Sequence, residues 1–396
     1  MIAEIANLAI DGAPQDDLVP DVIEIEVQED TTAADVFRVR LQLTVLPDGT
    51  WNYIDDERFS VWNRVSVEAG YPDDSAAIID GYITHVDVSI GGDGDSHLEI
   101  SGMDMSAMMD LDEKQLAWAN KKDHEIAQEI FRTYGLSCDV EDTVFPSSDS
   151  IVTVMQAETD VRFLRRLAAR NGFECYVRGG TGFFRSPNLQ DPPQKLLATE
   201  FGGQTNLTSL SLRVDGSRVT DVALQRIDPM KKQVDNEQLS DSPLRRLGRQ
   251  TLASLRSSVP AGGALAKHQP AASIAEMKAR LRGAYQGANQ FVAIDGEIDS
   301  RSYQHVLRAG KLVTVKGAGK RFSGMYYVTR VRHHFTTDGY VQRFEGWRNA
   351  LGLTGSEEFG ESSLPEAVSS GVGGASVASG NRVLPLRQSS TTRPGG

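Results

Sequence analysis

The chain has 396 residues, of which 40% are hydrophobic and 24% charged, a composition typical of a globular protein with two or three domains. The net charge of −13 argues against a general nucleic-acid binder, because phosphate contacts need an excess of Lys and Arg. Two cysteines are too few for a disulfide scaffold, no apolar run reaches the ~18 residues of a membrane span, and the start MIAEIANLAIDGAP lacks the basic residues of a secretory signal. We therefore expect a soluble protein made inside the cell, with no membrane insertion and no nucleic-acid specificity.

The first hundred residues predict antiparallel β-strands. In VIEIEV (22–27) and VFRVRLQL (36–43), apolar residues alternate with charged or polar ones. Because side chains in a strand point alternately to two faces, each strand has one buried and one wet face. Similar segments follow between turn signals, in NRVSVEAG, DGYITHVDVSI and SHLEISGMD. Residues 1–110 are therefore expected to form a first small β-barrel or sandwich.

A helical period replaces this alternation after residue 110. Asp123 is placed to cap a first helix that ends at Gly135, and Thr159 is placed to cap a second helix that ends at Gly172. A similar short strand follows each helix, GLSCDV and then GFECYV, and a hairpin over RGGTG closes the second unit. Residues 111–205 are therefore expected to form an α/β domain inserted into β structure.

The second of these helices is amphipathic. Its apolar stripe consists of Phe163, Leu164, Leu167 and Ala168. Four arginines lie mostly off that stripe and predict a basic face that is solvated or meets a partner: Arg162, Arg165, Arg166 and Arg170.

Alternation returns in residues 206–352, which predict a second β-barrel with an insertion at 231–290 that contains a helix in 272–288. The last strands, GKLVTVKG, GMYYVTRVRHHF and GYVQRFEGW, are joined by turns, one of which holds the hairpin dipeptide DG. The Gly/Ser-rich tail, 353–396, cannot bury enough apolar surface to fold alone. Five residues are expected to share one face of the middle strand: Tyr327, Thr329, Val331, His333 and Phe335.

The motifs for catalysis and metal binding are incomplete. HEIAQ has Gln128 where a zinc-protease helix needs its second His, and GAGKRF lacks the first Gly and the Ser or Thr of a phosphate loop. His333 and His334 are adjacent in a strand, so they point to opposite faces and cannot share a metal without distortion. The two cysteines, Cys138 and Cys175, have no CxxC or catalytic context. We therefore expect no enzyme activity and no catalytic, cofactor-binding or metal-binding residue.

Six segments, in this order along the chain, resemble the phage late-control protein D family: DERFSVWNRVSVEAGY, IIDGYITHV, ISGMDMSAMMD, QAETDVRFLRRLAARNGFECYV, VALQRIDPMKK and GMYYVTRVRHHFTTDGYVQRFEGWRN. The resemblance covers roughly residues 20–352. Its most specific pieces are the helix TDVRFLRRLAARNGF and the closing strands, which end at Arg348 and Asn349. That family comprises baseplate hub proteins of contractile phage tails and injection systems, and it is related to the hub half of the VgrG spike proteins of type VI secretion.

This resemblance implies a fold and a function. The fold is expected to be mainly β, with two β-barrel domains of the tail-hub type, the inserted α/β domain and a flexible C-terminal tail. The function is expected to be that of a structural baseplate hub, a homotrimeric ring that adapts the hexameric inner tube protein to the trimeric spike protein and contacts other baseplate (wedge) proteins. No OB-like barrel follows Gly352, so the spike tip is expected to be a separate protein.

Interface residues are expected on the basic helix, at Arg348 and Asn349, and in the tail at Arg382 and Arg387. The tail segment 383–396 is expected to become ordered along the spike or a neighbouring subunit, and the alternative is a disordered linker. Two other functions stay open at this point, a baseplate-associated cell-wall hydrolase and an effector-loading adaptor.

Overall fold

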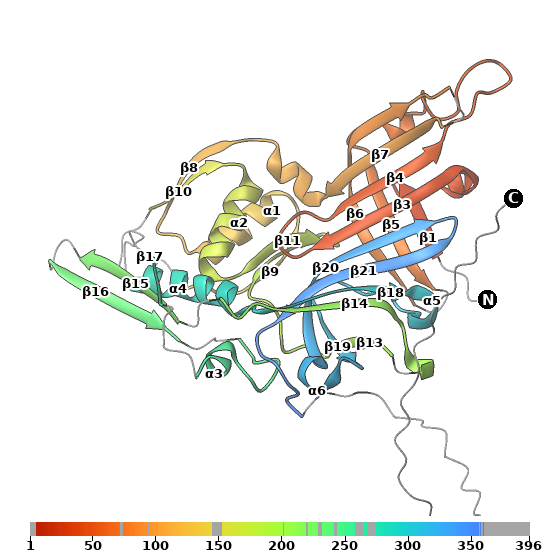
Figure 1. The fold of residues 1–396 in the computed structure, drawn as a ribbon. Helices are drawn as coiled ribbons and strands as arrows, with labels where there is room; N and C mark the ends of the chain where they lie inside the picture. The colour runs from red at the N-terminus through yellow and green to blue at the C-terminus, as the bar shows by residue number, and fades with distance from the viewer. Residues whose placement is uncertain are drawn as a thin grey trace, which may run out of the picture. The chain divides into compact units, whose positions relative to one another are not determined.

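The computed structural model describes residues 5–71, 74–92, 95–144, 153–200, 202–218, 221–228, 232–240, 244–257, 264–267, 274–355, 357 and 359. Their fold is mainly β with a smaller α/β part (Figure 1), as the alternation in the sequence predicts. Most of the Gly/Ser-rich tail lies outside these residues, and so do the predicted interface residues Arg382 and Arg387.

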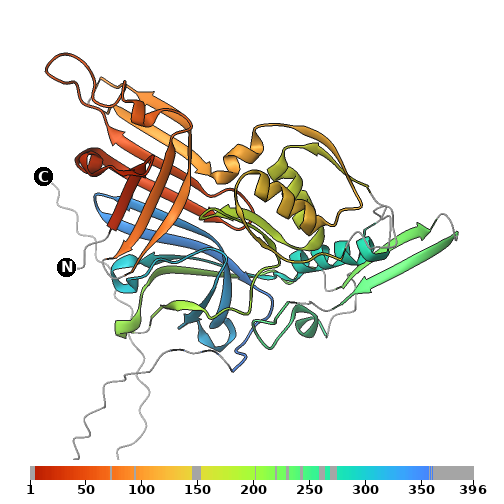
Figure 2. The ribbon, with the colours of Figure 1, turned by 180° about the vertical axis from the view of Figure 1, so that it is seen from behind.

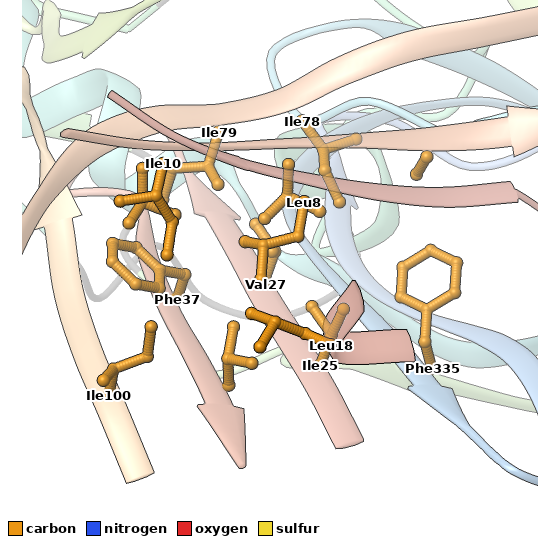
Figure 3. Close-up of a cluster of buried hydrophobic side chains, with 14 of the residues drawn as sticks. Leu8, Ile10, Leu18, Ile25, Val27, Phe37, Ile78, Ile79, Ile100 and Phe335 are labelled. Carbon is orange, nitrogen blue, oxygen red and sulfur yellow. The ribbon is translucent and has the colours of Figure 1, made fainter. Parts of the chain in front are cut away.

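The first β region encloses a core of mostly aliphatic side chains (Figure 3). Each strand turns alternate residues inward, so that Ile25 and Val27 on one strand and Phe37 and Val39 on the next are at most 3% exposed. Because six strands contribute to one core, the sheet curls around it in the manner of a barrel. The elements are β1 (Ile5–Ile10), β2 (Ala13–Pro14), η1 (Asp16–Asp21), β3 (Val22–Asp30), β4 (Val36–Gln42), η2 (Glu57–Phe59), β5 (Arg64–Tyr71), β6 (Asp74–Ser89), β7 (His97–Asp104) and η3 (Met105–Asp110).

The second β region curls around a separate core. Val313 and Val315 on one strand and Tyr326 and Val328 on the next are at most 1% exposed there. The elements are β13 (Gln194–Ala198), η4 (Gly202–Gln204), β14 (Leu207–Val214), β18 (Val292–Asp299), α5 (Ser300–Tyr303), β19 (Leu312–Lys316), α6 (Gly319–Phe322), β20 (Gly324–Thr336) and β21 (Gly339–Arg348). β13 precedes residue 206, the expected start of the second β-barrel, but it pairs with β19 of that region. The other domain boundaries expected from the sequence remain predictions.

The two β regions are joined in one sheet, because β3 pairs with β20 from Glu24 opposite Thr336 to Asp30 opposite Arg330. β20 pairs with β19 along its first half and with β3 along its second half. Phe335 of β20 packs into the core of the first region (Figure 3). Among the described residues this sheet has 13 strands, in the order β14–β18–β21–β20–β3–β4–β7–β6–β5–β1–β2, with β19 and then β13 branching off β20.

The face predicted for β20 is wrong in its first part, because a bulge interrupts the strand. Val328 lies opposite Gly346 and Arg330 lies opposite Glu345, so Thr329 is an extra residue without its own partner position. Because of the extra residue, the alternation of side chains between the two faces of the sheet is shifted by one position on either side of the bulge. Tyr327 therefore packs in a different cluster from Val331, whereas Val328 and Val331 share the second core.

The α/β part contains the helices predicted from the sequence. α2 begins after Thr159 and ends at Gly172, which has the left-handed conformation (φ 74°) expected of a C-terminal cap. The first helix differs at its start, because Asp123 is its first residue and Lys122 is its N-cap. The elements are β8 (Lys114–Ala119), α1 (Asp123–Thr133), β9 (Ser137–Val140), β10 (Thr153–Glu158), α2 (Asp160–Asn171), β11 (Glu174–Arg178) and β12 (Thr181–Arg185).

An arm emerges from the second β region and ends in a hairpin that extends past a helix, as Figures 1 and 2 show. Val222 and Leu224 of the hairpin are buried against Met277 and Leu281 of that helix, which agrees with the helix predicted in 272–288. The elements are β15 (Asp221–Asp228), β16 (Gln233–Leu239), α3 (Leu252–Leu255), β17 (Ala264–Lys267) and α4 (Ile274–Asn289).

Candidate functional site

The outward face of the large sheet is a ladder of ion pairs. The residues that alternate with the core residues of β3, β4 and β7 point away from the core, and many of them are charged. Arg40 Nη2 lies 2.9 Å from Glu99 Oε2, and Arg38 Nη2 lies 3.2 Å from Glu26 Oε2. Opposite charges thus face each other from strand to strand, which favours this pairing of the strands.

The ladder continues across the boundary between the two β regions. His334 Nε2 lies 3.1 Å from Glu24 Oε2, and Arg332 Nε lies 3.3 Å from Glu26 Oε1. Further along, Arg343 Nε lies 2.7 Å from Glu297 Oε2, beside a shallow hollow of about 360 Å³. Charged groups are depleted from the centres of protein interfaces. This face is therefore suited to contact water or the rim of a contact.

A buried ionic cluster holds the α/β part against both β regions. Glu29 at the end of β3 is fully buried, and it accepts hydrogen bonds from Arg308 Nε (2.5 Å) and from the backbone N–H of Ala309 (2.8 Å). Arg178 of β11 has its Nη1 3.7 Å from Glu29 Oε2, and it donates from Nε to Asp35 Oδ2 (2.8 Å). Burial opposes the charged form of Glu29, but Arg178 and Arg308 outweigh it and hold the pKa of Glu29 below its usual value.

A second buried contact in the same junction is a hydrogen bond from the Tyr327 hydroxyl to Glu174 Oε2 (2.6 Å). Burial raises the pKa of Glu174 to about 7, although the bond from Tyr327 acts in the opposite direction. Glu174 belongs to β11 and Tyr327 to β20. The α/β part is thus fixed to the second β region by a carboxyl group whose protonation changes near neutral pH.

The two adjacent histidines of β20 lie on opposite faces, as predicted. His333 is fully buried and its Nδ1 lies 2.7 Å from the Tyr340 hydroxyl, while His334 belongs to the ladder. Burial lowers the pKa of His333 to about 4, so the ring is neutral at neutral pH. In the described part of the chain, no group of three or more His, Cys, Asp or Glu side chains is placed to hold a metal ion, and no helix there has the length and apolarity of a membrane span.

The two cysteines are free thiols. Cys138 lies on β9 and Cys175 on β11, and both strands pair with β12, one on each side. Burial raises the pKa of the Cys175 thiol to about 12, so this thiol does not ionise at neutral pH.

The four arginines of the predicted basic face have different surroundings. Arg170 is mostly buried and donates from Nε to Asp123 Oδ2 (2.7 Å). Arg165 is half-buried, and Arg166 donates to Glu158 Oε1 (2.6 Å). Arg162 is the most exposed of the four, with its Nε 3.1 Å from Asp110. Arg162 and Arg166 are therefore the two with exposed side chains, and their role at an interface remains a prediction.

Arg348 and Asn349, expected at an interface, lie inside the chain instead. Arg348 is fully buried, and its Nη2 donates to the carbonyl oxygens of Leu247 and Gly352, each at 2.7 Å. Asn349 Oδ1 accepts a hydrogen bond from the Leu247 N–H (2.8 Å). Their polar groups bind the backbone of the arm to the end of β21, so these two side chains are not available to a partner.

Neither the ladder nor the buried cluster was predicted from the sequence. A signal for the ladder was present, since the polar positions of 22–27 are acidic and those of 36–43 are mostly basic, which is a charge pattern for neighbouring strands. Nothing local marks Glu29 as buried, because its partners Arg178 and Arg308 lie far along the chain.

The fold is that of tail-hub proteins. The 43 kDa tail protein of prophage MuSo2 from Shewanella oneidensis matches with a TM-score of 0.63 at 13% identity, over 88% of this chain and 100% of that chain. A tail protein from Neisseria meningitidis MC58 matches with 0.60 at 12%, over 88% and 97%. The c3393 protein of E. coli, described as a component of the type VI secretion system, matches with 0.51 at 12%, over 86% and 76%.

The comparison with curated proteins finds no match. The resemblance to phage late-control protein D remains a prediction, because the family model that matches is a different one. That model is described as the Alg8 N-terminal domain, and it matches residues 5–337. The chain therefore belongs to the Alg8 N-terminal domain family.

Proposed function

We propose that this chain is the structural baseplate hub of a contractile phage tail or a phage-tail-like injection system. The observation that carries the proposal is the fold match along 88% of the chain to the whole of a prophage tail protein. The buried carboxylates favour a structural role, since Glu29 is engaged by arginines and Glu174 by a tyrosine. In this role the protein is not an enzyme, and it is made in the bacterial cytoplasm and assembled into the particle.

The proposed assembly is a homotrimeric ring between a hexameric inner tube and a trimeric spike, with other baseplate proteins around it. Each chain has two curled β regions with separate cores, so three copies provide six similar units. Such a ring can present approximate sixfold symmetry to the tube and threefold symmetry to the spike. Kinship with late-control protein D and the VgrG hub is part of this proposal.

The native mass of the purified protein, alone and with its candidate spike protein, tests the ring. We expect a species of about three times the 43.2 kDa of one chain, with threefold particles in electron micrographs. A monomer under both conditions contradicts the ring and returns the hydrolase and adaptor functions to consideration.

We propose that the tail, including Arg382 and Arg387, binds the spike or a neighbouring subunit. Removing residues 353–396 is expected to weaken spike binding in a pull-down without lowering the melting temperature of the rest. Undiminished spike binding by the shortened chain contradicts this role.

A further inference from the structure

Charge is distributed very unevenly along the chain. Residues 1–110, the first β region, contain 24 Asp or Glu and four Lys or Arg, a net charge of −20. Residues 231–290, most of the arm, contain four Asp or Glu and ten Lys or Arg, a net charge of +6. A basic element on a strongly acidic chain is attracted to an acidic surface, including that of a second copy.

Part of one face of the arm is uncharged and largely exposed. Three residues of β15 and three of β16 lie directly opposite one another on the side away from α4, in the pairs Ile227–Val234, Gln225–Asn236 and Ala223–Gln238. None of the six carries a charge, although a quarter of the chain is charged. Ile227 is 72% exposed and Val234 is 57% exposed. An exposed uncharged face with an apolar pair is typical of the centre of a protein contact.

The same hairpin offers a strand edge. Among the described strands of this small sheet the order is β16–β15–β17, so β16 is one of its two outer strands. Figures 1 and 2 show the hairpin extending past α4, away from the large sheet. The turn next to Val234 carries the exposed Lys232. An outer strand has backbone N–H and C=O groups that can pair with another chain, and the exposed apolar pair adds to this tendency.

The first β region carries the matching features. Val86 and Val88 alternate along the end of β6 and are 37% and 45% exposed, and Ile90, directly after the strand, is 59% exposed. Asp87 is also exposed but lies on the opposite face of the strand, because it pairs with Glu99 of the ladder. The apolar strip belongs to a region of net charge −20, which is complementary to the arm with its apolar pair and basic turn.

We propose that the arm of one subunit docks on the acidic first β region of a second copy of this chain, with Ile227 and Val234 at the centre of the contact. The inference rests on the proposed ring and identifies the element that joins its subunits. The contact is heterologous, because the arm and its acceptor are different surfaces, and such contacts close into rings when the rotation between subunits allows it. A nucleic acid is disfavoured as the occupant, because the exposed face of the arm has amide and apolar groups where phosphate contacts need Lys and Arg.

The double variant Ile227→Asp/Val234→Asp tests the contact by native mass over a range of protein concentrations. Half-assembly is expected to need at least ~10-fold more protein, since two carboxylates at the centre of a contact must lose their water. Met155→Asp is the matched control, because Met155 is 61% exposed on an outer strand of the α/β part. Unchanged melting temperatures for both variants show that the fold is kept.

A photo-crosslinking residue in place of Val234 tests the partner directly. In a mixture of ¹⁴N- and ¹⁵N-labelled full-length chains, crosslinks between the two labels are expected to map to residues 1–110. Crosslinks within one label alone, or to another part of the second copy, overturn the proposal. A crosslink from this position to a duplex DNA probe of ~30 base pairs, which is long enough for several phosphate contacts, also overturns the proposal.

The outcomes separate the arm from the ring. If the double variant still forms trimers at the concentrations of the native protein, the arm proposal fails and the hub proposal stands. If the native protein with its spike is monomeric at every concentration, the ring fails and the arm contact fails with it.

Discussion

Glu174 and Tyr327 meet where the α/β part is packed against the second β region, and their hydrogen bond is buried. The pKa of Glu174 rises from 4.5 to about 7 on folding, so the folded state holds its proton more tightly than the unfolded state. The contribution of this group to the free energy of unfolding is therefore largest at low pH. It decreases as the pH rises from 4.5 to about 7 and stays low above that.

Glu174→Gln is expected to remove this loss, because the amide is neutral at every pH and its oxygen still accepts from Tyr327. The variant should match the native protein at pH 4 and exceed its free energy of unfolding by ~2 kcal/mol at pH 8. Urea unfolding at the two pH values measures this, with Glu113→Gln as a control at an exposed carboxylate. An equal difference at both pH values contradicts the assignment.

Arg348 shows a second use of a buried charge, because its partners are carbonyl oxygens rather than carboxylates. Lys has one point of charge and cannot reproduce the planar set of donors that reaches Leu247, Gly352 and Ser323. Arg348→Lys is expected to lower the free energy of unfolding by ~2–4 kcal/mol, measured by chemical unfolding. Arg343→Lys, at an exposed ion pair of the ladder, should change it by less than ~1 kcal/mol; equal effects of the two variants contradict the prediction.

Among the elements, helices α1 and α2 are held together by Arg170, which donates to the fully buried Asp123. Arg170→Ala leaves that carboxylate with less compensation in a buried place, and we expect a loss of ~3 kcal/mol. Hydrogen exchange should accelerate in both helices and much less in the large sheet. Arg166→Ala, which removes an exposed ion pair, is the control; a similar acceleration there contradicts the role of Arg170.

The sequence predicts elements well where the signal is local. Thr159 and Gly172 bound α2 as expected, because caps depend on residues within one turn of the helix end. The face of β20 is wrong at Tyr327 because a bulge adds one residue, and alternation alone does not reveal where a strand skips a position. Arg348 was expected at an interface, and its partners, backbone carbonyl groups, become visible only when the arm folds back on β21.

At the scale of the molecule, long-range pairing decides the architecture. β3 and β20 lie side by side although about 300 residues separate them. The alternation of apolar and polar residues in each strand is compatible with many partner strands. The ladder of ion pairs depends on the pairing of β3 with β20. The ladder is continuous because Glu24 and Glu26 meet His334 and Arg332 across it, so no local pattern predicts its full extent.

The buried cluster around Glu29 joins the two β regions and the α/β part, and we expect it to couple their unfolding. Glu29 belongs to the first β region. Its carboxylate balances the positive charge of Arg308 in the second β region and lies near Arg178 of the α/β part. Glu29→Gln is expected to leave two guanidinium groups with reduced compensation in a buried place, at a cost of ~3–5 kcal/mol. Because that cost falls on the contacts between parts, each part keeps its own core and its own stability.

Scanning calorimetry distinguishes this from a general loss of stability. The native protein is expected to unfold in one transition and Glu29→Gln in two, because the variant weakens the coupling more than the parts. Glu26→Gln is the matched control, since Glu26 lies on the same strand but in the partly exposed ladder, where an ion pair contributes ~0–1 kcal/mol. A single transition in Glu29→Gln, shifted to lower temperature, means that the parts are joined mainly by the pairing of β3 with β20 and by Phe335, and that the ionic cluster adds stability without coupling.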